Sequence, residues 1–137
     1  MEGAGYAMIT SAAEFLDLRF SEDPSKHQRA AHEDAPLHVW HELVEAYPES
    51  RFWVAHNKSV PSEILRLLAS DEDARIRAMV AMKRKLDEAT QEILARDPDS
   101  GVRMSIARNE RATERVLRSM LADPWDEIRK VVKDRLQ

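Results

Sequence analysis

The sequence has 137 residues and a formal net charge of −4 at pH 7, and 43% of its residues are hydrophobic and 34% charged. This composition is typical of a soluble, helix-rich chain rather than a disordered one. Three glycines are too few for a glycine-rich phosphate loop, the lack of cysteine excludes disulfides, thiolate metal sites and a cysteine nucleophile, and no apolar run approaches the ~18 residues that a membrane span needs.

The amino-terminal part of the chain has two predicted segments. Residues 1–9 carry no structural pattern and are interpreted as a flexible or vector-derived tail, with no basic region followed by an apolar stretch, which favours a cytoplasmic protein. Residues 10–22 are predicted to form a capping helix with Thr10 as its N-cap, because four apolar residues follow it: Phe15, Leu16, Leu18 and Phe20.

From residue 23 onward the chain repeats itself at a period of about 26 residues. "DEDARIR" (71–77), "DPDSGVR" (97–103) and "DPWDEIR" (123–129) recur at this spacing, and the arginine occurs four times, as Arg51, Arg77, Arg103 and Arg129. Three residues after each arginine stands a β-branched residue: Val54, Val80, Ile106 and Val132. A period of this size indicates a solenoid. We expect one domain over 10–137, with units at roughly 23–48, 49–70, 71–96, 97–122 and 123–137.

Each unit is predicted to contain two helices. The first begins at the aspartate, with Pro98 and Pro124 at the first helical position, and ends at a polar break such as "MKRK" or "RNER". The second begins at Pro61, Asp87 or Thr113 in successive units. No stretch alternates with period two for long enough to form a strand, so the predicted fold is all-α.

The repeated pattern resembles two known families. The "LLxDPDxxVRxxxA" helices resemble HEAT repeats, and the fuller pattern "R-x-x-VA-x-N-x-x-x-P-x-x-x-L-x-x-LA-x-D", nearly met by residues 51–71, resembles the variant leucine-rich repeat. The resemblance covers roughly residues 23–137 and implies a short right-handed α-solenoid. The chain departs from HEAT units, which run ~40–47 residues, and from the iron–sulphur members of the variant family, because it has no cysteine. No cofactor is expected.

The repeated charges predict a structural ladder. In HEAT repeats an aspartate and an arginine six residues apart form a ladder through the stack. We expect the four arginines of this chain to pair with aspartates of their own or neighbouring units and so to fix the stacking register: Arg51, Arg77, Arg103 and Arg129 with Asp71, Asp97 and Asp123. Direct contact of these arginines with a ligand is the alternative.

The edges of the predicted stack carry opposite charges. The breaks after the first helices are basic, and the opposite loops, such as 71–73 and 97–99, are acidic. Complementation of the helix dipole explains this pattern without a ligand. The functional interpretation is a basic rim that meets an acidic protein or a phosphate backbone. Its candidate residues are Lys58, Lys83, Arg84, Lys85, Arg108 and Arg111.

The outer face of the first helices carries candidate anchors for a protein partner: Phe52, Trp53, Met82 and Met104. Methionine and aromatic residues are common on adaptable binding surfaces. Core packing is the competing interpretation of the same spacing. Trp125 is either a contact site in its loop or a cover for the open end of the stack.

Metal binding and catalysis find little support. His38 and His41 lie one turn apart, but the helical metalloprotease pattern is lacking and we predict no metal site. No nucleophile motif is present, and a helical base-excision enzyme would depend on Trp53 with Asp73 or Asp99.

The function expected from the sequence is therefore a non-enzymatic protein–protein interaction module of bacterial type, for example a scaffold or an inhibitor that docks on a toxin. Binding of nucleic acid or another polyanion through the basic rim is the alternative, and an enzyme of the base-excision type is the remote one. No membrane or small-molecule substrate is inferred.

Overall fold

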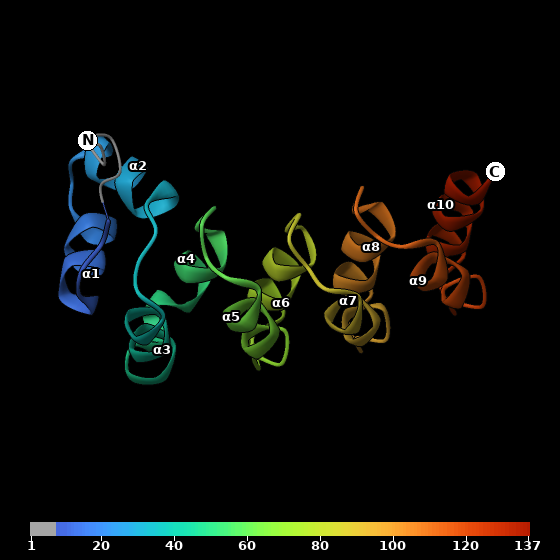
Figure 1. The fold of residues 1–137 in the computed structure, drawn as a ribbon. Coiled ribbons are helices and arrows are strands. Elements are labelled where there is room, and N and C mark those ends of the chain that lie inside the picture. The colour runs from blue at the N-terminus through green and yellow to red at the C-terminus, as the bar shows by residue number, and fades with distance from the viewer. Residues whose placement is uncertain (1–7) are drawn as a thin grey trace. The chain divides into compact units, whose positions relative to one another are not determined.

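The computed structural model describes residues 8–137, and within this range the chain is all-α (Figure 1). The described residues divide into two compact units, one ending at Ile64 and the other running from Leu65 to Gln137. The predicted tail over residues 1–9 lies almost entirely outside the described residues, and the single domain over 10–137 stays a prediction. No helix in the described part of the chain is long and apolar enough to cross a membrane.

The first unit contains four α-helices and a short 3-10 helix. They are α1 (Ala12–Phe20), α2 (Pro24–His32), α3 (Leu37–Ala46), η1 (Pro48–Ser50) and α4 (Arg51–His56), and α5 (Ser62–Leu68) contains the boundary between the units. Helix α1 packs on both α2 and α3. Phe15 of α1 and Trp40 of α3 are fully buried and meet edge to face, with ring centroids 5.7 Å apart, so they form the centre of this core.

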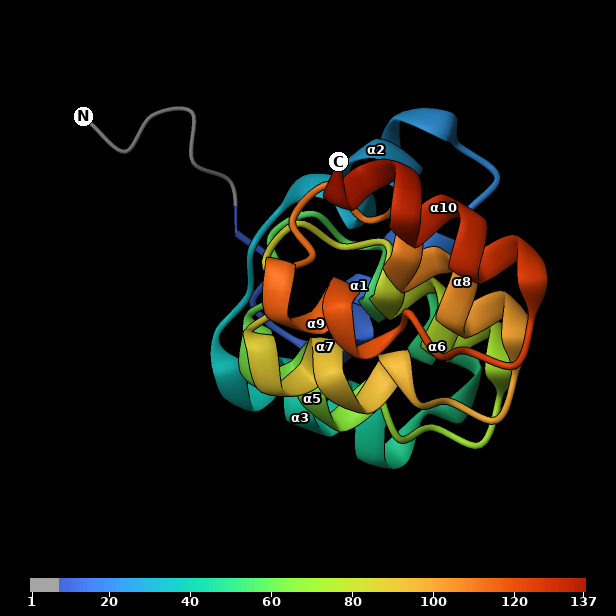
Figure 2. The ribbon, with the colours of Figure 1, turned by 90° about the vertical axis from the view of Figure 1, so that its right-hand side faces the viewer.

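The second unit contains α6 (Ala74–Ala81), α7 (Glu88–Ala95), α8 (Ser100–Arg108), α9 (Glu114–Ser119) and α10 (Asp126–Leu136). Helices α6, α8 and α10 pack in succession and form one row, while α7 and α9 form a second row beside it (Figures 1 and 2). The β-branched residues of the repeat lie between the rows, and Val80, Ile106 and Val132 are fully buried. Burial of the same position in each helix explains why these residues recur at a spacing of 26.

The predicted starts of the second helices are confirmed, and those of the first helices in the second unit are wrong by two residues. Asp87 and Thr113 are the N-caps of α7 and α9. In contrast, α8 begins after Asp99, whose Oδ1 accepts from the backbone N–H groups of Gly101 and Val102, and not after Asp97. The Asp97 carboxylate is used elsewhere, as described below. Pro98 and Pro124 therefore lie in the preceding loops and not at the first helical position.

The amino-terminal helix also starts one residue later than expected. Ser11 is the N-cap of α1, and its side chain accepts from the backbone N–H of Glu14. Thr10 instead donates its backbone N–H to the carboxylate of Glu14 at 2.8 Å. Of the four apolar residues in the predicted helix, Phe15 and Leu18 are buried, Leu16 is half-buried and Phe20 is 54% exposed.

Three of the capping aspartates, Asp23, Asp73 and Asp87, have pKa values below the usual one. Contacts with Ser25 lower the pKa of Asp23, the bond from Arg75 lowers that of Asp73, and the side chain and backbone N–H of Thr90 lower that of Asp87. In each case the folded state favours the charged carboxylate more than the unfolded chain does. The unfolded state therefore binds more protons at acidic pH, and the stabilisation is present above the ordinary aspartate pKa of about 3.9.

We expect the free energy of unfolding to fall as the pH drops below about 5, through the lowered folded-state pKa values. Asp87→Asn should leave stability at pH 7 nearly unchanged, because asparagine is an equally good N-cap that does not titrate. The same variant should lose less stability than the wild type on acidification. Urea denaturation at a series of pH values measures both effects, and an identical decline in the two proteins would show that Asp87 has no part in it.

Candidate interaction site

An arginine–aspartate ladder connects the loops of the second unit. Arg77 donates from Nε and Nη2 to the two carboxylate oxygens of Asp97, at 2.7 and 3.1 Å. Arg103 makes the same pair of contacts with Asp123, at 2.9 and 3.5 Å. All four side chains are nearly buried, with 13–14% of each arginine and 4% of each aspartate exposed. Two forked ion pairs 26 residues apart therefore share one geometry.

Each ladder arginine of the second unit also donates from Nη1 to the backbone oxygen six residues before it. Arg77 contacts the Asp71 oxygen, Arg103 the Asp97 oxygen and Arg129 the Asp123 oxygen, at distances of 2.7, 2.7 and 2.6 Å. The bond to Asp97 raises the pKa of Arg77 above its usual value. In the first unit, Arg51 donates to the oxygen of Val44. Each of these four guanidinium groups therefore donates to a backbone oxygen of the protein itself.

A second set of repeated hydrogen bonds, which the sequence patterns did not reveal, lies at the opposite ends of the same helices. Asn109 is buried, and its Nδ2 donates to the backbone oxygens of Ala81 and Lys83 at 2.8 and 2.9 Å. Arg135 donates to Ala107 and Asn109, 26 residues further along. In the first unit, Asn57 donates in the same way to Ala30 and Glu33. These side chains fix where each polar break lies relative to the preceding one.

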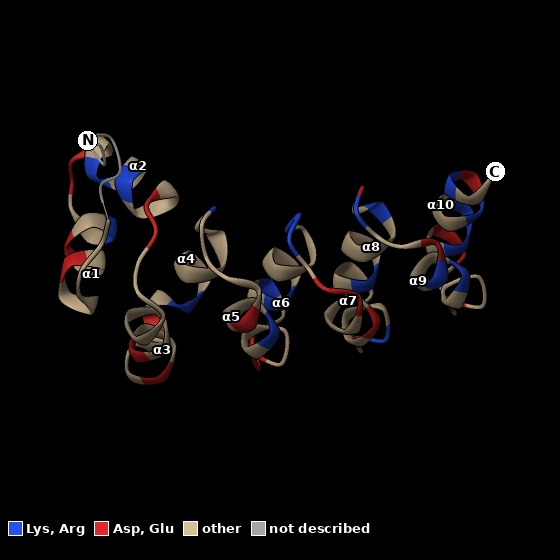
Figure 3. Ribbon diagram, viewed as in Figure 1, with Lys and Arg blue, Asp and Glu red and all other residues tan. Residues whose placement is uncertain are grey.

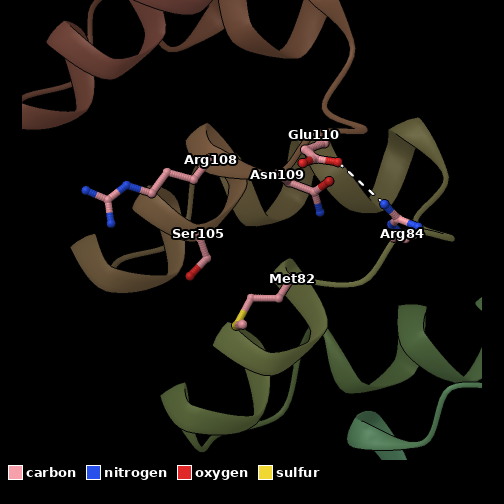
Figure 4. Close-up of a pocket in the computed structure, with 6 residues that line it drawn as sticks. All are labelled: Met82, Arg84, Ser105, Arg108, Asn109 and Glu110. Carbon is pink, nitrogen blue, oxygen red and sulfur yellow. Dashed lines mark ion pairs between the residues drawn. The ribbon is translucent and has the colours of Figure 1, made fainter.

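A groove of about 520 Å³ lies between the carboxyl-terminal ends of α6 and α8 (Figure 4). We call it the α6–α8 groove; it is lined by Met82, Arg84, Ser105, Arg108, Asn109 and Glu110. Arg84 and Glu110 lie at one end of the groove and Arg108 at the other, with the Met82 and Ser105 side chains between them. Met82 is 62% exposed, so an apolar side chain is presented to solvent between two guanidinium groups.

The segments that follow α6 and α8 contain mostly basic residues (Figure 3), but the groove lining also includes one acidic residue, Glu110. Lys83, Arg84 and Lys85 follow α6, and Arg111 follows α8, at the ends opposite the acidic loops. Glu110 breaks the pattern and pairs with Arg84 at 3.5 Å, where both side chains are more than 70% exposed. Such an exposed pair contributes little to stability. Arg84 can therefore exchange Glu110 for a carboxylate of a ligand at small cost.

The structure places the predicted anchor residues in different environments. Met104 is 8% exposed, so the expectation that it lies on the outer surface is wrong, and its side chain is buried. Phe52 and Trp53 are half-buried in the first unit and contact each other edge to face at 5.0 Å. Met82, Arg84 and Arg108 are brought together in one groove.

The remaining candidate residues have simpler surroundings. Lys58, in the first unit, is exposed, and its backbone N–H donates to the oxygen of Ala31. His38 is exposed, and His41 contacts the Glu63 carboxylate at 3.1 Å. Within residues 8–137 no group of three or more histidine and acidic side chains could hold a metal ion. Trp125 is 41% exposed and precedes α10 as its N-cap residue.

Three lining residues of the groove were missed by sequence reasoning. Ser105 and Glu110 occur where a polar surface is expected, and nothing in their pattern distinguishes them. Asn109 carried a usable signal, because it stands 52 residues, or two repeat periods, after Asn57. The groove itself joins residues at one sequence spacing, since Met82 and Arg108 are 26 residues apart, as are Arg84 and Glu110.

No protein-family model matches the chain, and no curated protein or solved structure is significantly similar to it.

Proposed function

We propose that this chain is a non-enzymatic protein-interaction module that binds an acidic, leucine-containing segment of a partner protein in the α6–α8 groove. The observation that carries the proposal is the placement of exposed Met82 between the guanidinium groups of Arg84 and Arg108. A methionine side chain adapts to different apolar partners, and arginine binds carboxylates through two parallel hydrogen bonds. An apolar side chain flanked by carboxylates on the partner complements this arrangement.

The scaffold of this function is proposed to be a short right-handed α-solenoid of 26-residue units, similar to HEAT and variant leucine-rich repeats. The equal geometry of the Arg77–Asp97 and Arg103–Asp123 pairs supports this proposal. Asn109 and Arg135 support it as well, because both donate to backbone oxygens 26 to 28 residues before them. A stack held at both ends of its helices presents the groove rigidly, which lowers the entropy lost on binding. We assign the protein to the cytoplasm of a bacterium.

Binding of nucleic acid through the same basic residues is the alternative function. The basic loops favour it, whereas Glu110 within the groove and the net charge of −4 oppose it. The base-excision alternative has weaker support, because Asp73 and Asp99 already accept from backbone N–H groups as N-caps. A carboxylate engaged in this way is poorly suited to activate a nucleophile.

The experiment is fluorescence anisotropy with a short glutamate-rich peptide that carries one leucine. Arg108→Glu should weaken binding about tenfold or more, because it replaces a charge-assisted hydrogen bond with repulsion. Met82→Ala should weaken binding of this peptide by a smaller factor and leave a peptide with serine in place of leucine unaffected. Arg118→Glu is the matched control: its side chain is 59% exposed and lies outside the groove, and the substitution changes the net charge equally.

Three results would contradict the proposal. Equal weakening by Arg118→Glu would mean that the peptide responds only to net charge. Tighter binding of a DNA duplex than of the peptide, with affinity falling steeply as salt is added, would favour the polyanion alternative. Release of a base from a damaged duplex would establish the enzyme.

A further inference from the structure

A second hollow, of about 190 Å³, lies in the first unit between α1, α2 and α4. We call it the Arg19 hollow; its lining includes Arg19, His27, Gln28, Ala31, Trp53 and His56. The volume corresponds to about six water molecules at the ~30 Å³ that each occupies in the liquid. No carboxylate is among the described residues that line it. The hollow is therefore of a size for one small polar group and is surrounded by nitrogen-bearing side chains.

Arg19 is the unusual residue of this hollow. Its guanidinium carbon lies 3.4 Å from the centroid of a Trp53 ring, so the planar group is held against the indole face. Arg19 forms no hydrogen bond or ion pair with any described residue, and its Nε atom is buried without a partner. A buried donor without an acceptor is costly, and buried arginines are normally paired with a carboxylate. The group is thus oriented by the indole and retains its hydrogen-bonding capacity.

The surroundings of Arg19 are held in place by contacts within α4 and between α2 and the residue that follows α1. Trp53 meets Phe52 and His56 edge to face, with centroid distances of 5.0 and 5.6 Å, so its ring has little freedom to turn. The His27 Nε2 donates to the Ser21 oxygen at 2.5 Å, which fixes the imidazole next to the hollow. By contrast, Arg29 of α2 is paired with the carboxylates of Glu33 and Glu14.

We propose that the Arg19 hollow binds the phosphate group of a small phosphate monoester. Arg19 supplies a forked pair of donors, and the imidazoles of His27 and His56 line the same space. A tetrahedral phosphate has three terminal oxygens for these groups, whereas a carboxylate has two. This site belongs to the first unit and shares no residue with the α6–α8 groove, so it stands independently of the proposed function.

The test is titration of the isotopically labelled full chain with inorganic phosphate and with glycerol 3-phosphate, followed by NMR at constant ionic strength. We expect saturable shifts of the Trp53 indole N–H and of the His27 and His56 ring signals, with half-saturation below about 10 mM. The indole signals of Trp40 and Trp125 serve as internal references and should not move. Acetate at the same concentration should bind at least about tenfold more weakly.

Arg19→Gln should weaken phosphate binding about tenfold or more, because it removes the charged fork. Gln28→Glu tests the same point without removing a packing contact. Gln28 is exposed and lines the hollow, and the substitution replaces its amide with a carboxylate of nearly the same shape. It should also abolish measurable binding, so the proposal remains testable where Arg19→Gln fails to fold. Arg84→Gln, in the second unit, should have no effect.

Several outcomes would overturn the proposal. Shifts that stay linear in phosphate, or that appear equally at the α6–α8 groove, would indicate non-specific contact with arginines. Unchanged affinity in Gln28→Glu would place the anion elsewhere. Equal binding of acetate and phosphate would exclude a site built for a tetrahedral group. Equal affinities for glycerol 3-phosphate and inorganic phosphate would support the phosphate site and would show that the phosphate group alone is recognised.

Discussion

Replacing Asp97 with alanine is expected to destabilise the folded chain by about 3–5 kcal/mol. The Asp97 carboxylate accepts from Nε and Nη2 of Arg77 and from the backbone N–H of Asp99, and only 4% of the side chain is exposed. Its removal leaves the Arg77 guanidinium, which is 14% exposed, without a counter-charge. Urea denaturation at pH 7, followed by circular dichroism, measures the loss.

Two further variants separate the buried ion pair from the charge alone. Asp126→Ala removes an exposed carboxylate, 83% accessible, that pairs with Arg129, and it should cost less than about 1 kcal/mol. The double variant Arg77→Met with Asp97→Leu should recover most of the stability lost in Asp97→Ala, because it leaves no buried charge. If Asp97→Ala loses no more stability than Asp126→Ala, the Arg77–Asp97 pair contributes no more to the free energy of unfolding than an exposed pair.

The Asn109→Ala variant is expected to lose about 2–4 kcal/mol. Asn109 donates to the oxygens of Ala81 and Lys83 and accepts from the backbone N–H of Arg111 at 2.8 Å, so alanine leaves all three groups without this partner. The Arg111 amide should exchange with solvent faster in the variant, which hydrogen-exchange NMR detects at that one residue.

Asn57→Ala is the parallel test in the first unit, because Asn57 makes the same three contacts there with Ala30, Glu33 and Ser59. Ser105→Ala is the matched control: Ser105 lines the groove beside Asn109 but donates only to the oxygen of Gly101 within its own helix. Ser105→Ala should change stability by less than about 0.5 kcal/mol. Equal losses of stability in Asn109→Ala and Ser105→Ala would show that the hydrogen bonds of Asn109 do not stabilise the fold as proposed.

The all-α class and the starts of α7 and α9 were predictable from the sequence, because hydrophobic periodicity and N-cap chemistry act locally. The start of α8 was not. Asp97 and Asp99 are equally good caps by residue type, and the choice between them is made by Arg77, twenty residues away, which takes the carboxylate of Asp97. A contact between distant loops thus decides a local boundary.

Of the candidate site, the sequence predicted only the exposure of the charged residues, because charged side chains are rarely buried. Arg84 and Arg108 were expected on the surface and are exposed in the groove, but Met104 and Met82 have the same residue type and opposite burial. The pairing of Arg19 with Trp53 joins residues 34 positions apart without any repeated pattern. The second set of repeated hydrogen bonds was hidden because residue type changes along it, from Asn57 and Asn109 to Arg135, while the backbone oxygens that accept stay equivalent.

The fixed spacing of the arginine–aspartate ladder constrains how this protein can change in length. Arg77 and Arg103 each reach a carboxylate twenty positions ahead, and Asp123 would take that place for Arg77 if the segment 97–122 were excised. Deletion or duplication of 26 residues at a time preserves the forked ion pairs. A deletion or insertion of any other length leaves a buried guanidinium without a carboxylate partner. Insertions and deletions in such a chain are therefore restricted to multiples of 26 residues. The arginine–aspartate ion pairs impose this restriction as much as helix packing does.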